Sequence, residues 1–298
     1  MNGVLLIDKP TGPTSFDVVR AVRRAFDQRK VGHAGTLDPL ASGLLVVCLG
    51  QGTKLVPYLM DGDKRYSATV RLGFETDTDD ALGEPMEEAP VPELSADQIT
   101  TALARFRGAI EQVPPVYSAL KSGGEPLHRK ARRGERVAPE PRTITIHELE
   151  MVRFANDEID LEVCCSKGTY VRSLARDLGR ALGTRAHLRS LRRTASSGFE
   201  VDDALTLKEL ERIAEPADPT DRIIPLADAL PAFPAVTLGA DDLPRVLNGN
   251  PIPAPDSVLP MDDETETFVR LIAPSGDLVA IARPEQDLLQ PVRVFPLD

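Results

Sequence analysis

Alternating or continuous runs of apolar side chains predict strands along the whole length of this 298-residue chain. Residues 66–72 alternate strictly between apolar and polar, which is typical of a half-buried strand. Apolar runs that end at clusters of Pro or Gly indicate buried strands. The predicted strands are 3–8, 43–49, 66–72, 142–154, 158–165, 267–272 and 278–283. Turns are expected at Asn156-Asp157 and at Pro274-Ser275-Gly276-Asp277.

Apolar positions at helical spacing predict two well-defined helices. Val18, Val19 and Val22 lie on one side of a helix that Thr14 or Ser15 caps. The clearest helix runs from Gly168 to Leu182, where a basic row lies beside the apolar stripe. This row consists of Arg172, Arg176 and Arg180.

Two shorter helices are predicted at 102–110 and 207–213, and the acidic segment 77–99 is expected to be a loop. Strands interspersed with helices indicate the α/β (α+β) class. The chain is long for one domain, and residues 200–230 form a Pro- and acid-rich connection. We therefore predict a large domain at 1–225 and a small β-rich module at 226–298.

The formal net charge of −11 conceals a strong asymmetry along the chain. Residues 1–76 carry 10 basic and 7 acidic side chains, and residues 100–199 carry 18 and 11. Residues 200–298 carry 7 basic and 20 acidic side chains. Such asymmetry favours nucleic-acid binding by the basic parts, with acidic surface elsewhere keeping the molecule soluble.

Several classes of protein find no support in the sequence. It has no run of eighteen apolar residues and no secretion signal at its N-terminus, so we expect a cytoplasmic protein without a membrane segment. Neither the three cysteines nor the four histidines show metal-ligand spacing. The lone Gly50-Gln51-Gly52 is more typical of a tight turn than of a dinucleotide loop.

Asp38 is the most informative candidate for chemistry. It lies in the glycine-punctuated segment 30–43, which holds only one carboxylate and one histidine, His33. Pro39 keeps Asp38 out of helical geometry, at a turn or at a helix entry. Two interpretations stay open from these residues alone. Asp38 is either a helix N-cap followed by Pro39 at the first helical position, or a reactive carboxylate.

Separated motifs in chain order show that the sequence resembles the TruB-type tRNA pseudouridine synthases. The matches run from residue 3 to about 200, and such an ordered set is not expected by chance. The motifs are Asp8-Lys9-Pro10 with Thr14-Ser15, Gly32-His33-Ala34-Gly35-Thr36-Leu37-Asp38-Pro39, Lys64-Arg65-Tyr66, Thr76-Asp77-Thr78 with Asp80, Tyr117-Ser118-Ala119-Leu120-Lys121, Gly168-Thr169-Tyr170-Val171-Arg172 and Leu191-Arg192-Arg193-Thr194.

The resemblance implies an isomerase that converts a T-loop uridine of tRNA, position 55, to pseudouridine without a cofactor or metal. It implies the pseudouridine-synthase fold, a mixed and mostly antiparallel sheet flanked by helices, with a small PUA-like module after it. Asp38 matches the family's nucleophile, and Arg172 matches the arginine that pairs with it. By their residue types alone, Arg172 is also compatible with a solvated helix face and Tyr66 with a core position.

The remaining site assignments also come from the resemblance. Tyr66 would stack on the target base, Tyr170 and Leu191 would wall its pocket, and His33 matches a histidine near the nucleophile. The expected RNA contacts are Asp80, Lys121, Lys130 and Arg132, within a wider basic patch that includes the arginines from Arg172 to Arg193. The family usually has tyrosine where this chain has His128, which leaves the contact there open.

The expected partner is the T-arm of tRNA, bound by a monomer. Two alternatives remain. One is a module that binds or folds tRNA without turnover, and the other is a synthase directed at another RNA. Asp38 with Tyr66 and Arg172 favours the enzyme, and the motif 117–121 favours tRNA over ribosomal RNA. The acidic module at 226–298 is assigned an RNA-binding role only by the resemblance.

Overall fold

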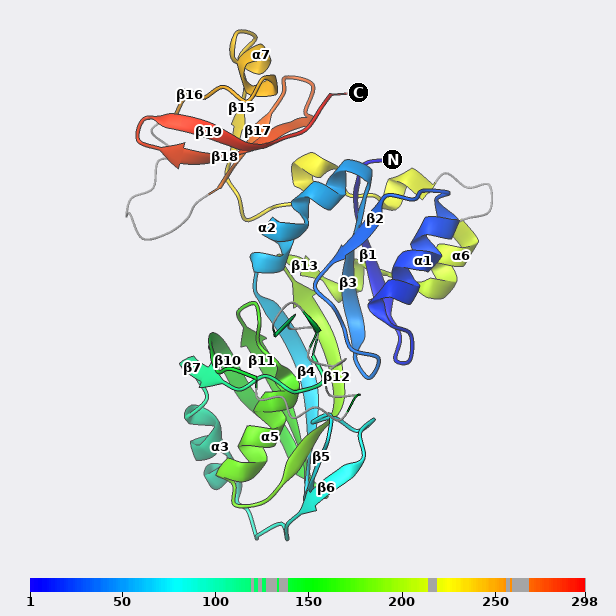
Figure 1. Ribbon diagram of the computed structural model, residues 1–298, viewed down its shortest axis with the longest axis vertical. Coiled ribbons are helices and arrows are strands. Elements are labelled where there is room, and N and C mark those ends of the chain that lie inside the picture. The colour runs from blue at the N-terminus through cyan, green and yellow to red at the C-terminus, as the bar shows by residue number, and fades with distance from the viewer. Residues whose placement is uncertain are drawn as a thin grey trace.

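A computed structural model describes residues 1–118, 121–122, 125–126, 133, 139–213, 219–255, 258 and 268–297. Two β-sheets dominate it, one running through the body of the molecule and a smaller one at its upper end in Figure 1. Its helices are α1 (Ser15–Ala25), α2 (Val56–Asp61), α3 (Ala96–Ala104), α5 (Val171–Ala181), α6 (Leu207–Ile213) and α7 (Asp242–Leu247).

The large sheet is mixed and mostly antiparallel. Its main path runs β14-β1-β3-β12-β4-β11-β10-β7, while β2 pairs with β3 and β13 with β12. Only β1–β14 and β3–β12 are parallel among the pairs described in this sheet. Its strands are β1 (Gly3–Lys9), β2 (Val31–Ala34), β3 (Ser42–Leu49), β4 (Lys64–Leu72), β7 (Gly108–Gln112), β10 (Arg142–Ala155), β11 (Glu158–Cys165), β12 (Ala186–Ser196), β13 (Phe199–Glu200) and β14 (Leu205–Thr206).

The smaller sheet has the order β15-β17-β18-β19-β16. Its strands are β15 (Ala235–Thr237), β16 (Ile252–Pro253), β17 (Val269–Ile272), β18 (Leu278–Glu285) and β19 (Leu288–Val294). Two hairpins, β5 (Phe74–Thr76) with β6 (Pro85–Glu88) and β8 (Lys121–Ser122) with β9 (Glu125–Pro126), stand apart from both sheets.

One continuous core joins the large sheet to α1, α3, α5 and α6. The alternating residues of β4 explain how the sheet contributes, because Tyr66, Ala68 and Val70 point into this core while Ser67 and Thr69 do not. A second core packs the smaller sheet onto the large one, through contacts that include Leu278 and Phe295 with residues of β1, β3 and α2.

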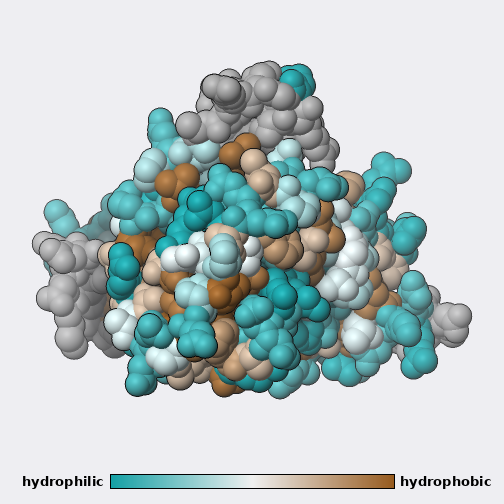
Figure 2. Space-filling view, turned by 90° about the horizontal axis from the view of Figure 1, so that it is seen from below, coloured by the Kyte–Doolittle hydropathy of each residue, from teal (hydrophilic) through white to brown (hydrophobic). Residues whose placement is uncertain are grey.

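The surface seen in Figure 2 is mostly hydrophilic, with apolar residues in separate patches between the polar ones. This distribution is expected when most large apolar side chains are buried in the cores, which include a third one within the smaller sheet. No helix in the described part of the chain is long and apolar enough to span a bilayer.

The predicted α/β class and the mixed, mostly antiparallel sheet are confirmed, and so are the predicted strands within a few residues at their ends. Of the two predicted caps, Thr14 and Ser15, it is Thr14 that caps α1, through a capping box with Asp17. Asn156 and Asp157 form the turn between β10 and β11, both with positive φ.

The prediction for 77–110 was wrong in two places. The segment 77–99 is not only loop, because it contains β6 and the start of α3. The helix predicted at 102–110 begins instead at Ala96, where Ser95 and Gln98 form a capping box, and ends at Ala104. Gly108, at φ +83°, then starts strand β7, which pairs with β10.

Candidate active site

Asp38 lies in the loop between β2 and β3, and no helix follows it. The N-cap interpretation was therefore wrong. The loop is held to α1 because the Ser15 hydroxyl donates to the Leu37 carbonyl at 3.0 Å and accepts from the Leu37 amide at 2.8 Å. It closes on itself where the Ala41 amide donates to the Asp38 carbonyl at 3.0 Å. The Asp38 side chain keeps 40% of its surface exposed, so this loop presents a carboxylate that an incoming group can reach.

Arg172 reaches Asp38 from the first turn of α5. Its Nε lies 2.9 Å from Asp38 Oδ2 and 3.8 Å from Asp80 Oδ2, while its side chain is only 6% exposed. Nη1 donates to the Thr78 carbonyl at 2.9 Å and Nη2 to the Tyr117 carbonyl at 3.1 Å. Nε has no aligned hydrogen-bond acceptor among the described residues, so its contacts with the two aspartates are ion pairs. The solvated-face interpretation of Arg172 was therefore wrong.

The start of α5 is fixed by an amide side chain from β7. The Tyr170 amide donates to Gln112 Oε1 at 2.8 Å, and Gln112 Nε2 donates to the Tyr170 carbonyl at 3.1 Å. This reciprocal pair satisfies backbone groups at a helix end that lacks a side-chain cap of its own. It holds Tyr170 and Arg172 at the same end of the helix.

Asp80 lies inside the structure rather than on its surface. It is 5% exposed, and its Oδ1 accepts hydrogen bonds from the Thr78 hydroxyl at 2.7 Å and from the Leu82 amide at 3.0 Å. Its other oxygen faces Arg172. Both Asp80 oxygens therefore face groups of the protein, and Asp80 is a second carboxylate beside Arg172. Its buried position does not favour the direct RNA contact that the resemblance implied.

Tyr66 and Leu191 come from neighbouring strands at the centre of the sheet. Tyr66 pairs with Arg193 across β4 and β12, and Leu191 pairs with Ala68 two residues away. Tyr66 is buried, and this burial raises the pKa of its hydroxyl. The charge of Arg193 and its hydrogen bond to the hydroxyl oppose this increase, while Asp38 adds to it. Burial raises the pKa of Tyr170 in the same way, with a smaller contribution from Asp38.

His33 lies on β2, five residues before Asp38, and is partly buried. Desolvation lowers its pKa, and the nearby Arg193 lowers it further, so the neutral imidazole is favoured at neutral pH. Its Nδ1 is buried without a hydrogen-bond partner among the described residues. This environment suits a neutral hydrogen-bonding or stacking group better than a proton carrier.

Sequence reasoning missed two buried cations beneath the site. Lys9 is fully buried and its Nζ donates to the carbonyls of Pro10 at 2.8 Å and Pro13 at 2.9 Å. Burial lowers the pKa of Lys9 to about 8, although Asp38 acts in the opposite direction. Arg193 is 1% exposed and donates to the carbonyls of Leu44 at 2.7 Å and Gly35 at 3.1 Å. Both residues lie in the motifs that match the family, and these motifs were the only feature of the sequence that could have marked them as site residues.

Most arginines of the expected basic phosphate patch on α5 and β12 pair with carboxylates of the protein. Arg172 and Arg176 do so in buried positions, whereas the other paired arginines keep 35–58% of their side chains exposed. The described pairs are Arg172 with Asp38 and Asp80, Arg176 with Asp79 and Asp177, Arg180 with Glu75, Arg185 with Glu75 and Glu87, Arg189 with Glu158 and Arg192 with Asp8.

The other expected RNA contacts lie mostly outside the described residues, as Lys130, Arg132 and His128 do. Lys121 begins strand β8, where it pairs with Pro126. Within the described part of the chain, no three His, Cys, Asp or Glu side chains gather in a way that could hold a metal ion.

Comparison with known proteins supports the motif-based resemblance. Residues 23–171 match the model of the N-terminal domain of the TruB family of pseudouridylate synthases. Residues 172–230 match the model of the C-terminal domain of tRNA pseudouridylate synthase B. The chain belongs to the TruB family.

Curated TruB relatives match over most of their length. A tRNA pseudouridine synthase B of Nitrosococcus oceani is 42% identical over 289 residues, covering 96% of this chain and 92% of that protein. A tRNA pseudouridine synthase B of Escherichia coli (strain K12) is 46% identical over 263 residues, covering 85% and 83%. The family assignment predicted from the motifs is therefore confirmed.

Solved structures confirm the predicted fold. The chain superposes on a protein of an H/ACA RNP bound to a substrate RNA containing 2'-deoxyuridine with a TM-score of 0.74 at 24% identity, covering 99% of this chain and 85% of that one. A chain of a Cbf5-Nop10-Gar1 complex gives a TM-score of 0.72 at 26% identity, covering 99% and 84%. Both structural matches therefore extend over the large sheet and the smaller sheet.

Proposed function

We propose that this protein converts uridine to pseudouridine in tRNA, at position 55 of the T loop. The curated relatives at 42% and 46% identity carry the name tRNA pseudouridine synthase B, which supports this substrate. The observation that carries the proposal is the contact of 2.9 Å between Arg172 Nε and Asp38 Oδ2, made to an aspartate whose side chain is 40% exposed.

The reaction rearranges bonds without any net gain or loss of atoms. The bond between ribose C1' and uracil N1 breaks, the base turns, and a bond forms between C1' and C5. The hydrogen on C5 leaves as a proton, and N1 gains one. A nucleophile that bonds reversibly to the nucleotide divides this change into easier steps. The residues leave open whether Asp38 attacks the ribose or the uracil ring.

Asp38 fits the role of nucleophile because it is charged, partly open and held in place. Arg172 stabilises its negative charge, and the loop contacts to Ser15 limit its movement. A guanidinium fixed by two backbone carbonyls keeps its position as the carboxylate is consumed and released. Asp38 therefore acts as the nucleophile and Arg172 as its charge partner.

Tyr66, Tyr170 and Leu191 are the proposed walls of the base pocket, with His33 near its entrance. A uridine in an RNA loop must leave its stack to reach Asp38, and extrusion costs a few kcal/mol. Aromatic stacking and apolar contact in the pocket offset that cost. The buried cations Lys9 and Arg193 add a positive potential that favours the negative charge of a freed uracil.

An exposed aromatic ring on α1 supports an RNA surface beside the Asp38 loop. Phe16 is 53% exposed, and the guanidinium groups of Arg20 and Arg23 lie 5.6 and 5.7 Å from its ring centre. Its neighbour Ser15 holds Leu37, and Arg23 donates to the Val31 carbonyl at 2.9 Å, so this stripe borders the segment leading to Asp38. An aromatic ring flanked by arginines suits an unstacked RNA base.

The decisive experiment compares the parent protein with Asp38→Asn on unmodified tRNA. The parent should form pseudouridine at position 55, mapped by chemical probing, while the variant should bind tRNA with similar affinity and form none. Turnover by Asp38→Asn at the parental rate would refute the nucleophile. Tight tRNA binding without product from the parent would favour a module that binds or folds tRNA, and product at other RNAs alone would favour a different substrate.

A further inference from the structure

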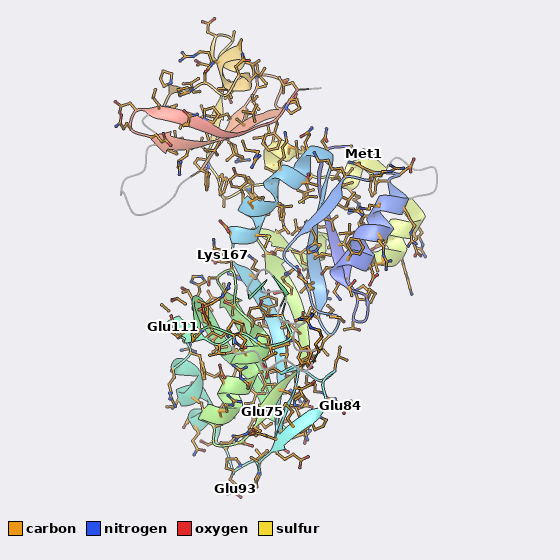
Figure 3. All side chains as sticks on the ribbon, viewed as in Figure 1. Met1, Glu75, Glu84, Glu93, Glu111 and Lys167 are labelled. Atoms are coloured by element: carbon orange, nitrogen blue, oxygen red, sulfur yellow. The ribbon has the colours of Figure 1, made fainter. Side chains whose placement is uncertain are left out.

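The arginines of α5 form three successive pairs with the segment 75–80. Arg172 faces Asp80, Arg176 binds Asp79 and Arg180 binds Glu75. The three arginines follow one another at intervals of four residues along the helix. Figure 3 labels Glu75, which lies beside α5 at the far end of this row from Asp38. The first pair belongs to the proposed active site, and the second, Arg176 with Asp79, lies one helical turn further along α5.

Arg176 is almost completely buried and uses all three of its nitrogens. Its side chain is 10% exposed. Nη1 donates to Asp79 Oδ2 at 2.8 Å, Nη2 to the Val113 carbonyl at 3.0 Å, and Nε to Asp177 Oδ1 at 2.9 Å. The residue therefore ties α5 to two other segments, 76–80 and 113–117.

Asp79 holds an unusual backbone conformation at the centre of this contact. Its φ is +60°, which non-glycine residues seldom adopt. The Asp79 carbonyl accepts from the Leu188 amide at 3.0 Å, and its amide donates to the Thr76 carbonyl at 3.1 Å. Burial raises the pKa of Asp79 to about 6, and Arg176 opposes that change. Such a residue needs its partner in place to keep a charge and a strained backbone inside the protein.

The two segments that Arg176 binds are those that hold Arg172. Thr78, whose carbonyl accepts from Arg172 Nη1, directly precedes Asp79. Tyr117, whose carbonyl accepts from Arg172 Nη2, ends the short segment that begins at Val113. Ser173 strengthens the second link, because its hydroxyl also donates to the Val113 carbonyl, at 2.8 Å.

We infer that Arg176, through Asp79 and the Val113 carbonyl, is a positioning residue that sets the orientation of the Arg172 guanidinium toward Asp38. This inference rests on the proposed function. Arg176 makes no described contact with Asp38 itself, so its effect passes through Arg172. A displacement of about 1 Å at a reacting group can cost about a hundredfold in rate.

The third pair supplies a matched control on the same helix. Arg180 binds Glu75 through two hydrogen bonds of 2.7 and 2.6 Å, yet it is 51% exposed. It contacts neither of the two carbonyls that hold Arg172 among the described residues. Arg180→Met therefore removes an ion pair to the same segment without touching the support of Arg172.

The test measures kcat, KM and thermal midpoint for Arg176→Met and Arg180→Met in the full chain, with unmodified tRNA. We expect Arg176→Met to lower kcat about 10- to 100-fold with KM within about twofold, and Arg180→Met to keep kcat within about threefold. Asp79→Asn, which tolerates positive φ, should lower kcat in the same direction even if Arg176→Met folds poorly.

A double-mutant cycle separates positioning from general destabilisation. In single-turnover assays with excess enzyme, Arg176→Met should lower the rate of an Arg172→Lys protein by less than about threefold, because the group it positions is already lost. Equal losses in both backgrounds, or equal kcat for Arg176→Met and Arg180→Met, would overturn the inference. A parent protein that forms no pseudouridine would instead overturn the proposed function.

Discussion

Replacing Arg172 with lysine keeps the charge beside Asp38 but removes the geometry. The guanidinium reaches the carbonyls of Thr78 and Tyr117 and both carboxylates at once, because its donors point in different directions. An ammonium group is a single point and must choose between the carbonyls and Asp38. At least one charge-assisted hydrogen bond is lost, worth about 1.5–3 kcal/mol, and a buried carbonyl without a donor adds about 1–3 kcal/mol.

If about 3–4 kcal/mol of this total appears in the transition state, the rate falls by about 10²–10³-fold. Single-turnover release of tritium from tRNA labelled at uridine C5 measures it, since bond formation at C5 expels that hydrogen. Arg189→Lys is the control, because the Arg189 side chain is 58% exposed and its Nε lies 3.1 Å from Glu158 Oε1 in a surface ion pair. It should stay within about twofold of the parent. A rate for Arg172→Lys within threefold of the parent would show that charge alone suffices.

Three further substitutions test the buried Lys9, the close approach of Gly43 to the Arg193 backbone, and the exposed ring of Phe16. Because burial lowers the pKa of Lys9 from 10.5 to about 8, the folded protein loses this proton before the unfolded chain does, and the contribution of Lys9 to stability rises between those pH values. Urea unfolding across this range should show a steeper rise in the parent than in Lys9→Met, where Lys64, whose pKa burial also lowers to about 8, still contributes; identical slopes would contradict the role of Lys9. Gly43→Ala should destabilise the fold by about 2–5 kcal/mol, because its φ is +98° and a Cβ would lie 2.2 Å from the Arg193 carbonyl oxygen. Gly108 has φ +83° and open space around it, so Gly108→Ala should lower the free energy of unfolding by only about 1–2 kcal/mol. Urea unfolding measures both glycine variants, and equal losses of stability would exclude the clash at Gly43 as the cause. Phe16→Leu should weaken tRNA binding about tenfold in filter binding with kcat unchanged, whereas Phe16→Tyr should bind normally; equal affinities would remove the ring from the RNA surface.

Elements whose burial pattern is local were predictable from sequence, and elements set by distant contacts were not. Strand β4 alternates in its own sequence, and the capping box of α1 lies within four residues. Strand β12 was missed although it lies at the centre of the sheet, between β3 and β4. Its sequence contains three arginines, and two register shifts interrupt its pairing with β4, so no regular alternation marks it.

The candidate site shows the same division. A motif can identify Asp38, but its local sequence equally fits a helix N-cap, and only the contacts of Ser15 with Leu37 decide between a turn and a helix. The arginines of α5 read as a solvated row because their partners lie about a hundred residues earlier in the chain. Asp79 and Asp80 looked like part of the acidic loop predicted at 77–99 for the same reason. The acidic segment and the basic helix appear in sequence as two separate charge patterns, but the structure joins them where Asp79 and Asp80 face Arg176 and Arg172. Part of the positive charge counted in residues 100–199 is therefore used in contacts within the protein.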